Sequence, residues 1–281
     1  MKIGISPGNF MCFGDERYQV LRESGFDCVD FSMVDTESDF YLLSDELLER
    51  AIAHERELAS EAGVEISQVH GPWRWPAHDA APVEREERLE KMIRSIRMTA
   101  RLGCKYWVVH PIMPFGIEEQ GSELAPQTRA LNLEFMRKLL AVAHEENIVI
   151  CLENMPMPRF SLGSPQAILD FVQEINDPHF KMCLDTGHVS VFPSLKVGDE
   201  TRKLGDVIRV LHIHDNSGHG DEHLMPGRGI IDWADFVQAL RQIGFDGVFS
   251  LEPAYPAGMS PFDKKAYYRD LAQLASKMLT M

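Results

Sequence analysis

Side chains that can bind metals end one apolar run of this chain after another. Six successive runs finish in His, Glu or Asp, at His70, His110, Glu153, Asp185, His212 and Glu252. One polar residue after a β-rich run carries little information, but six in succession indicate that the run ends meet at one place. In a barrel of parallel strands, every carboxyl end surrounds the same pocket. The sequence therefore predicts a barrel with a metal centre and an active site at that end.

Strand-like and helix-like segments alternate along the whole chain. The expected strands are short and rich in Ile, Val, Phe or Cys, as strands buried on both faces are; they are 2–6, 28–32, 65–70, 106–110, 148–153, 180–185, 207–215 and 247–252. Amphipathic helices are expected at 15–25, 44–63, 83–103, 125–147, 164–175, 232–244 and 263–281, with fewer helical features at 192–205. Strict alternation favours an α/β fold, a closed (β/α)₈ TIM barrel, over an open doubly wound sheet.

Length and composition agree with one soluble barrel. The 281 residues contain no linker rich in Pro, Gly or Ser, so we predict a single domain over residues 1–281. The net charge of −15 disfavours a nucleic-acid partner, because such affinity depends on Lys and Arg neutralising phosphates. Five cysteines, an odd number lying mostly in apolar runs, suit reduced thiols. Without a signal-peptide pattern or a membrane-spanning run, we expect a cytoplasmic protein that does not contact a membrane.

Glu153, Asp185, His212 and Glu252 form the centre of the predicted site. Each ends a different strand, and this mixed oxygen and nitrogen set suits one divalent ion such as Mn²⁺, Co²⁺, Mg²⁺ or Zn²⁺. Alone, each residue could instead cap a helix or pair with an arginine. Three carboxylates that converge on one pocket would repel each other without a cation, so the four together favour the metal site.

Neighbouring histidines extend this set. His188 follows Asp185 in the motif DTGH and can reach the same pocket, as a substrate donor or as a ligand of a second metal. In His212-x-His214, strand alternation would aim both rings to one side, one toward a metal and the other toward substrate. His70 and His110 are either core histidines or substrate-binding residues.

Arg228 and several aromatic residues are candidates with an ordinary structural alternative. Arg228 lies in the turn PGRG, where it either holds a substrate oxygen or is a solvated surface residue. An apolar wall at the pocket, or ordinary loop packing, would account for the aromatic residues of two loops: Phe10, Phe13, Trp73 and Trp75.

These motifs resemble the xylose-isomerase-like TIM barrel superfamily, which contains sugar phosphate isomerases and epimerases and the endonuclease IV branch. CLEN, CLDTGH, HIHDN with DEH-x-x-PGRG-x-x-DW, and SLEP occur in the family's order, and the resemblance covers essentially the whole chain. Similarity to ketose 3-epimerases implies one divalent metal held by Glu153, Asp185, His212 and Glu252. It also implies that His188 and Arg228 hold the substrate, a small sugar or sugar derivative, and that the protein forms a homo-dimer or homo-tetramer.

The endonuclease IV branch supplies the alternative. That branch holds three zinc ions, and this chain has residues of matching type at the additional ligand positions: His70, His110, His188, Asp221 and His223. CLENMPMPRF and CLDTGHVSVF depart from that branch, however, and the charge of −15 suits duplex DNA poorly. The first prediction is a metal-dependent sugar or sugar phosphate isomerase or epimerase, with proton transfer between Glu153 and Glu252 through an enediolate. The alternatives are a phosphoesterase with two or three zinc ions, in which Asp221 and His223 are additional ligands, and a non-catalytic metal or sugar binder.

Overall fold

The computed structural model describes residues 1–6, 10–77, 79–254 and 258–281. Within these residues, eight parallel strands form one sheet in the order β7-β6-β5-β4-β3-β2-β1-β8. Their bounds are β1 Ile3–Ile5, β2 Cys28–Ser32, β3 Glu65–His70, β4 Tyr106–Val109, β5 Val149–Glu153, β6 Phe180–Asp185, β7 Ile208–His212 and β8 Phe249–Leu251. The sequence pattern predicted β2, β3 and β6 to the residue, because polar or turn residues flank each of these apolar runs.

Ile213 joins the two outer strands of this sheet. Its N–H donates to the carbonyl of Ser250 at 2.9 Å, and its own carbonyl accepts from the N–H of Glu252 at 2.9 Å. This parallel bridge links the carboxyl ends of β7 and β8. The protein is therefore a single (β/α)₈ TIM barrel, and the predicted fold class is confirmed.

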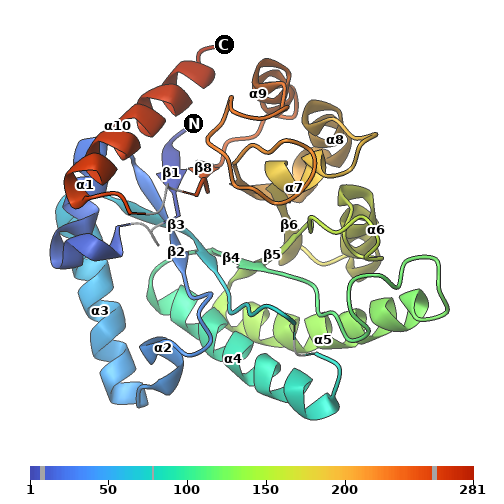
Figure 1. Ribbon diagram of the computed structural model, residues 1–281. Coiled ribbons are helices and arrows are strands. Elements are labelled where there is room, and N and C mark those ends of the chain that lie inside the picture. The colour runs from blue at the N-terminus through green and yellow to red at the C-terminus, as the bar shows by residue number, and fades with distance from the viewer. Residues whose placement is uncertain (7–9, 78, 255–257) are drawn as a thin grey trace.

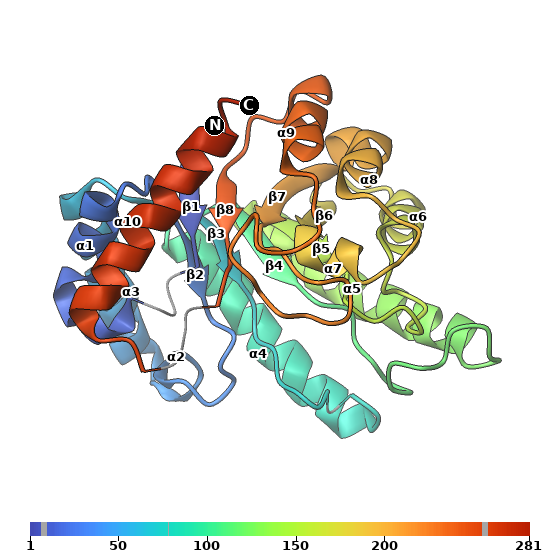
Figure 2. The same cartoon turned by 45° about the horizontal axis from the view of Figure 1, so that its top comes forward.

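Helices surround the strands (Figure 1), and the views agree that α10 lies beside α1 and that the two termini lie close together (Figure 2). The α-helices are α1 Arg17–Ser24, α2 Asp39–Leu42, α3 Asp45–Ala62, α4 Pro82–Arg101, α5 Ala125–Glu146, α6 Pro165–Ile175, α7 Thr186–Ser190, α8 Val197–Leu204, α9 Trp233–Gln242 and α10 Pro261–Met278, with 3₁₀ segments η2 Met11–Glu16 and η3 Gly205–Val207. None of the helices in the described ranges is long and apolar enough to span a bilayer.

Local sequence signals account for most helix boundaries. Asp232 caps α9 by accepting the N–H of Asp235 at 3.1 Å, as its position before the helix predicts. Gly63 ends α3 with a φ of 67°, a conformation that glycine adopts without strain. The helix expected at 192–205 is shorter, because Phe192 and Leu195 form a turn and α8 begins only at Val197. The patterns missed the short helices α2 and α7.

Strand alternation decides which side chains face the barrel interior. Val108, Val149, Cys151, Cys183 and Val210 form a buried cluster separate from the larger core. Successive side chains of a strand point to opposite faces. On four strands, the residue two positions after a member of this cluster therefore points to the same inner face. These residues are His110, Glu153, Asp185 and His212. Small apolar side chains fill the lower interior, and ligand-type side chains occupy its carboxyl end.

Candidate metal centre

His212 lies between the carboxylates of two other strands. Its Nδ1 is 3.1 Å from Glu153 Oε1, at the end of β5, and 3.3 Å from Glu252 Oε2, just beyond β8. Ligand atoms of Asp185, His212 and Glu252 lie within 4.8 Å of one another, as do those of Glu153, Asp185 and His188. The four residues predicted as metal ligands are thus brought together.

Asp30, on β2 across the barrel, orients the His212 ring. The Nε2–H of His212 donates to Asp30 Oδ2 at 3.0 Å. Nδ1 is fully buried without a hydrogen-bond partner, and in the metal-free protein burial opposes protonation of the ring but the neighbouring carboxylates raise the pKa of His212 well above 6.5. A lone pair that faces two carboxylate oxygens is repulsive unless a cation or a proton lies between them. The donor set and this orphaned nitrogen fit a divalent metal, and a carboxylate behind a histidine is a frequent support of metal ligands.

His70 and His110 approach the other oxygen of Glu153. Nε2 of His110 is 3.1 Å from Glu153 Oε2, and Nε2 of His70 is 3.5 Å from the same atom. The His70 ring stacks on that of His212, with centroids 5.5 Å apart. His70 also donates its Nδ1–H to the carbonyl of Gly71 at 2.9 Å, which leaves Nε2 free to accept or to ligate. Both histidines belong to the site rather than to the apolar core, and their substrate-binding role stays a prediction.

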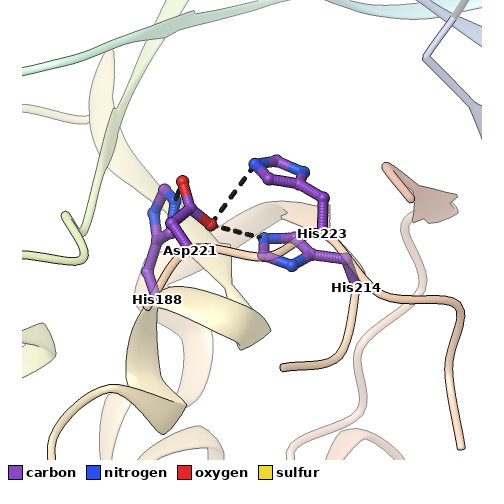
Figure 3. A group of neighbouring side chains, drawn as sticks. All are labelled: His188, His214, Asp221 and His223. Carbon is purple, nitrogen blue, oxygen red and sulfur yellow. Dashed lines mark hydrogen bonds and ion pairs between the residues drawn. The ribbon is translucent and has the colours of Figure 1, made fainter. Parts of the chain in front are cut away.

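A second group adjoins the first and consists of His188, His214, Asp221 and His223 (Figure 3). Asp221 lies between the rings, 3.3 Å from His188 Nε2, 3.3 Å from His223 Nε2 and 3.7 Å from His214 Nε2. The rings of His214 and His223 stack at 3.9 Å. His188 and His223 each donate Nδ1–H to a main-chain carbonyl, of Asn154 and Glu252 respectively, so each turns Nε2 toward Asp221, where this nitrogen donates when the ring is protonated and can ligate a metal when it is not. This pattern also fits a metal.

His212 and His214 contact different carboxylates, and the metal and substrate roles that strand alternation suggested for them stay predictions. β7 ends at His212, so His214 lies beyond the regular strand. His214 Nε2 contacts Asp185 at 3.1 Å and belongs to the second group, whereas His212 faces Glu153 and Glu252. The two rings therefore face different carboxylates in adjoining groups.

The electrostatics of the first group follow from burial and close pairing. Burial disfavours the ionised form of Glu153, yet His212 and His110 outweigh it and hold the pKa of Glu153 well below its usual 4.5. Burial lowers the pKa of His110 to about 4, so its ring is neutral at pH 7. Glu153 is thus an ionised carboxylate at neutral pH, ready to bind a cation or accept a proton.

The second group combines raised imidazole pKa values with a lowered carboxyl pKa. Burial opposes protonation of His188, but Asp185 and Asp221 raise its pKa to about 10. Burial likewise opposes protonation of His223, whose pKa Asp221 and Glu252 raise to about 9. Burial works against ionisation of Asp221, but hydrogen bonds from His188 and His223 hold its pKa below the usual 3.8. Without a metal, protons on these rings balance the carboxylate charge.

Two residues beside the ligands hold the site together. Asn154 donates to the carbonyl of Asp185 at 3.0 Å and accepts its N–H at 2.9 Å, so the ends of β5 and β6 are clamped. Gly187 lies against the His214 ring, where an added Cβ would come within 2.0 Å of His214 Cε1. The sequence patterns gave no role to either residue.

Asp215 organises the loop that carries Asp221 and His223. This fully buried residue ends the run LHIHD, but its carboxylate accepts from the N–H groups of Gly227 at 2.9 Å and Ile231 at 3.2 Å and from the Trp233 indole at 3.0 Å. Its role is therefore to shape the loop. Sequence position alone could not separate this role from that of a ligand.

A cavity of about 360 Å³ opens above both groups and is lined by His70, His110, Glu153, His188, Asp221, His223 and Glu252 together with apolar residues. Arg228 is exposed and does not line this cavity, so its role as a substrate holder stays a prediction. Trp73 and Trp75 line it, whereas Phe10 is buried and stacks on Tyr268 at 4.1 Å. The aromatic residues thus divide between a pocket wall and ordinary packing.

Fold and site together define a class of protein: a TIM barrel with a metal-type cluster at the carboxyl ends of its strands. The family model described as xylose isomerase-like TIM barrel matches residues 18–277. The chain therefore belongs to this family, as its motifs predicted.

Relatives of known and unknown activity share this family. The chain is 32% identical over 203 residues to an uncharacterized protein, MJ1311, of Methanocaldococcus jannaschii, covering 70% of this chain and 67% of the relative. It is 27% identical over 257 residues to the D-psicose 3-epimerase of Enterocloster bolteae, covering 88% and 79%. The structure of D-psicose 3-epimerase with D-tagatose from Clostridium cellulolyticum H10 matches with a TM-score of 0.80 at 18% identity, over 99% of both chains. This structural match shows a common fold, and the sequence matches support membership among sugar epimerases and isomerases.

Proposed function

We propose that this protein is a metal-dependent sugar isomerase or epimerase in which Glu153 and Glu252 transfer the proton. The observation that carries this proposal is the position of the two carboxylates. They approach one nitrogen of His212 from different strands, at 3.1 and 3.3 Å, and both line the cavity. Carboxylates on two sides of a pocket can flank a substrate, so that one accepts a proton and the other returns it.

Glu153, Asp185, His212 and Glu252 would hold one divalent metal. The set of three carboxylates and one imidazole suits Mn²⁺, Co²⁺, Mg²⁺ or Zn²⁺. When bound, such an ion acts as a Lewis acid toward carbonyl and hydroxyl oxygens, which makes a neighbouring carbon-bound proton more acidic. The buried Nδ1 of His212, which has no hydrogen-bond partner, supports this assignment.

The remaining polar residues would bind and orient the substrate. Negative charge develops on oxygen as the carbon-bound proton leaves and an enediolate forms, and nearby donors stabilise that charge. His188 is held through its Nδ1–H by the carbonyl of Asn154 and presents Nε2 to the cavity. His70 and His110 are placed to hold further hydroxyl groups on the side of Glu153.

A phosphoesterase with two or three zinc ions is the second candidate, because a further group of ligand-type residues lies beside the first. His188, His214, Asp221 and His223 have ligand atoms within 4.8 Å of one another. Zinc ions in such sites activate water and clamp a phosphate. The acidic net charge of −15 argues against DNA as the substrate.

Metal stoichiometry and turnover separate the two candidates. We expect about one tightly bound metal per chain in the four-ligand site, with interconversion of ketoses or aldoses in the presence of Mn²⁺ or Co²⁺. Two or three zinc ions, lost in Asp221→Ala or His223→Ala but retained in the matched control Glu222→Gln, would favour the hydrolase. A nicking assay on a duplex with an abasic site would then test DNA as substrate. A broad panel of sugars, phosphorylated ones included, without any interconversion would refute the isomerase proposal.

A further inference from the structure

Two loops at the carboxyl end of the barrel are joined to each other. Residues 110–124 connect β4 to α5, and residues 154–164 connect β5 to α6. The N–H of Gln120 donates to the carbonyl of Arg159 at 3.0 Å, and Glu118 Oε1 lies 3.6 Å from Arg159 Nη1. The loop after β4 therefore holds the loop after β5 at several successive residues.

Glu119 is the buried part of this link. Only 3% of Glu119 is exposed, whereas the side chain of its neighbour Glu118 is 66% exposed. The two carboxylate oxygens of Glu119 accept the N–H of Ser161 at 3.1 and 3.3 Å, and Oε1 also accepts the Ser161 hydroxyl at 2.5 Å. A carboxylate that leaves water requires such hydrogen bonds in place of its hydration. The contact therefore fixes the main chain of the second loop at Ser161.

Hydrogen bonds within the second loop connect Ser161 to the wall of the cavity. The N–H of Phe160 donates to the carbonyl of Met157 at 3.0 Å, and the N–H of Met155 donates to the carbonyl of Gly163 at 2.8 Å. The loop is close-packed at Gly163, where an added Cβ would lie 2.5 Å from the carbonyl oxygen of Met157. Met155 and Met157 both line the cavity above the metal centre. Each of them is thus one hydrogen bond away from a residue within two positions of Ser161.

Apolar packing also holds this loop, but in a different way. Phe160 and Leu162, the two neighbours of Ser161, are buried in the core. Hydrophobic contacts are non-directional, so they keep the loop on the barrel without fixing where its main chain lies. The directional contacts of Glu119 supply that second constraint.

We propose that Glu119 is a positioning residue for the cavity: through Ser161 it sets the place of Met155 and Met157, and with them the fit of the bound molecule. The inference rests on the proposed function for the nature of that molecule, a sugar. Glu119 does not line the cavity, so it acts through the loop and not by contact with substrate. Its loss should weaken substrate binding and leave the metal ligands and the proton transfer in place.

Amide hydrogen exchange of the metal-loaded protein tests the contact itself. In Glu119→Ala we expect the amides of residues 154–163 to exchange about ten-fold faster or more, because the loop opens locally more often. Ser161→Ala, which removes the hydroxyl but keeps the N–H, should have a smaller effect. Glu118→Gln is the matched control, since an exposed ion pair contributes little, and it should exchange as the wild type does. Unchanged exchange in both Glu119→Ala and Ser161→Ala, shown to be folded by thermal melting, would overturn the inference.

Steady-state kinetics test whether the contact matters for the cavity. For the sugar that the wild type converts fastest, we expect Glu119→Ala to raise KM several-fold, with kcat and Mn²⁺ affinity within about two-fold of the wild type. Glu119→Gln keeps one acceptor oxygen for Ser161 and should restore part of the loss, which general destabilisation would not explain. Adding Ser161→Ala to Glu119→Ala should raise KM no further, because both changes remove the same contact. An unchanged KM in Glu119→Ala, or additive effects of the two changes, would overturn the inference.

The two proposals fail in different ways. A wild type that converts no sugar of the panel refutes the proposed function, and exchange at the Met155 amide then decides the role of Glu119 alone. A wild type that converts a sugar, with the same KM in Glu119→Ala, leaves the proposed function intact and refutes the positioning role.

Discussion

Replacing Asp30 tests whether this residue of the barrel interior orients His212 for metal binding. Asp30 is 2% exposed, and its Oδ2 accepts from His212 Nε2 and from Gln68 Nε2, each at 3.0 Å. Asp30→Leu leaves the His212 N–H buried without a partner, at a cost of about 1–3 kcal/mol. Loss of such a support typically weakens metal binding by about 10–100-fold, or roughly 1.4–2.7 kcal/mol. Asp30→Asn retains an acceptor oxygen, so we expect a smaller loss.

Titration calorimetry with Mn²⁺ against a competing chelator measures this effect, and thermal melting shows whether each variant is folded. Asp27→Asn is the matched control, because Asp27 precedes the same strand but is partly exposed and pairs with Arg22. The control should bind metal as the wild type does. A folded Asp30→Leu variant with wild-type metal affinity would refute the idea that Asp30 orients His212 for the metal.

Three further predictions concern the ligands, the packing around them and the pH dependence. Glu153→Gln and Glu252→Gln should each abolish turnover and lower metal content while melting stays cooperative, and wild-type metal content in both variants would contradict the proposed site. Gly187→Ala should displace the His214 ring, because the new Cβ would lie 2.0 Å from it. The displaced ring would lose its contact with the predicted ligand Asp185, so metal binding should weaken. Gly220→Ala, which meets nothing within 4 Å, is the control, and equal metal affinity of the two variants would be evidence against this packing. In the metal-free protein, burial opposes protonation of His188, but Asp185 and Asp221 raise its pKa to about 10. Burial also opposes protonation of His223, but Asp221 and Glu252 raise its pKa to about 9. These pKa values exceed that of a histidine in the unfolded chain, about 6.5. The two pairings therefore stabilise the folded protein fully below pH 6.5, and this contribution is lost as the pH rises toward 10. The Tm of chelator-treated protein should fall from pH 7 to 10, and a rising Tm would contradict the pairing.

The parts of the site that lie on strands could be predicted from the sequence. Glu153, Asp185 and His212 alternate with small buried residues of the barrel interior, so the period of two that marks a strand also places them at the pocket. Asp30 was missed although it is an acidic residue within the apolar run CVDFS. Its partner His212 lies 182 residues away, and a contact of that length has no local signal.

Loop residues were harder to place, because their positions depend on contacts between distant segments. Asp215 follows the same apolar run as His212, but its carboxylate is used by main-chain N–H groups of residues 227 and 231, which no periodicity reveals. Arg228 lies in a turn of the expected kind, yet that turn leaves its side chain exposed. Trp73 and Trp75 line the cavity while Phe10 does not, a division that local sequence could not decide.

Incorporation of solvent deuterium is the most direct test of proton transfer between Glu153 and Glu252. The metal-saturated protein is incubated in D₂O with neutral ketoses and aldoses, and substrate and product are analysed by mass spectrometry and NMR. Protons held on carboxylates exchange with solvent, so we predict that the product carries deuterium at the carbon where the configuration or the carbonyl position changes. Conversion of a sugar without deuterium uptake would indicate direct hydrogen migration between carbons and would contradict the two-glutamate mechanism.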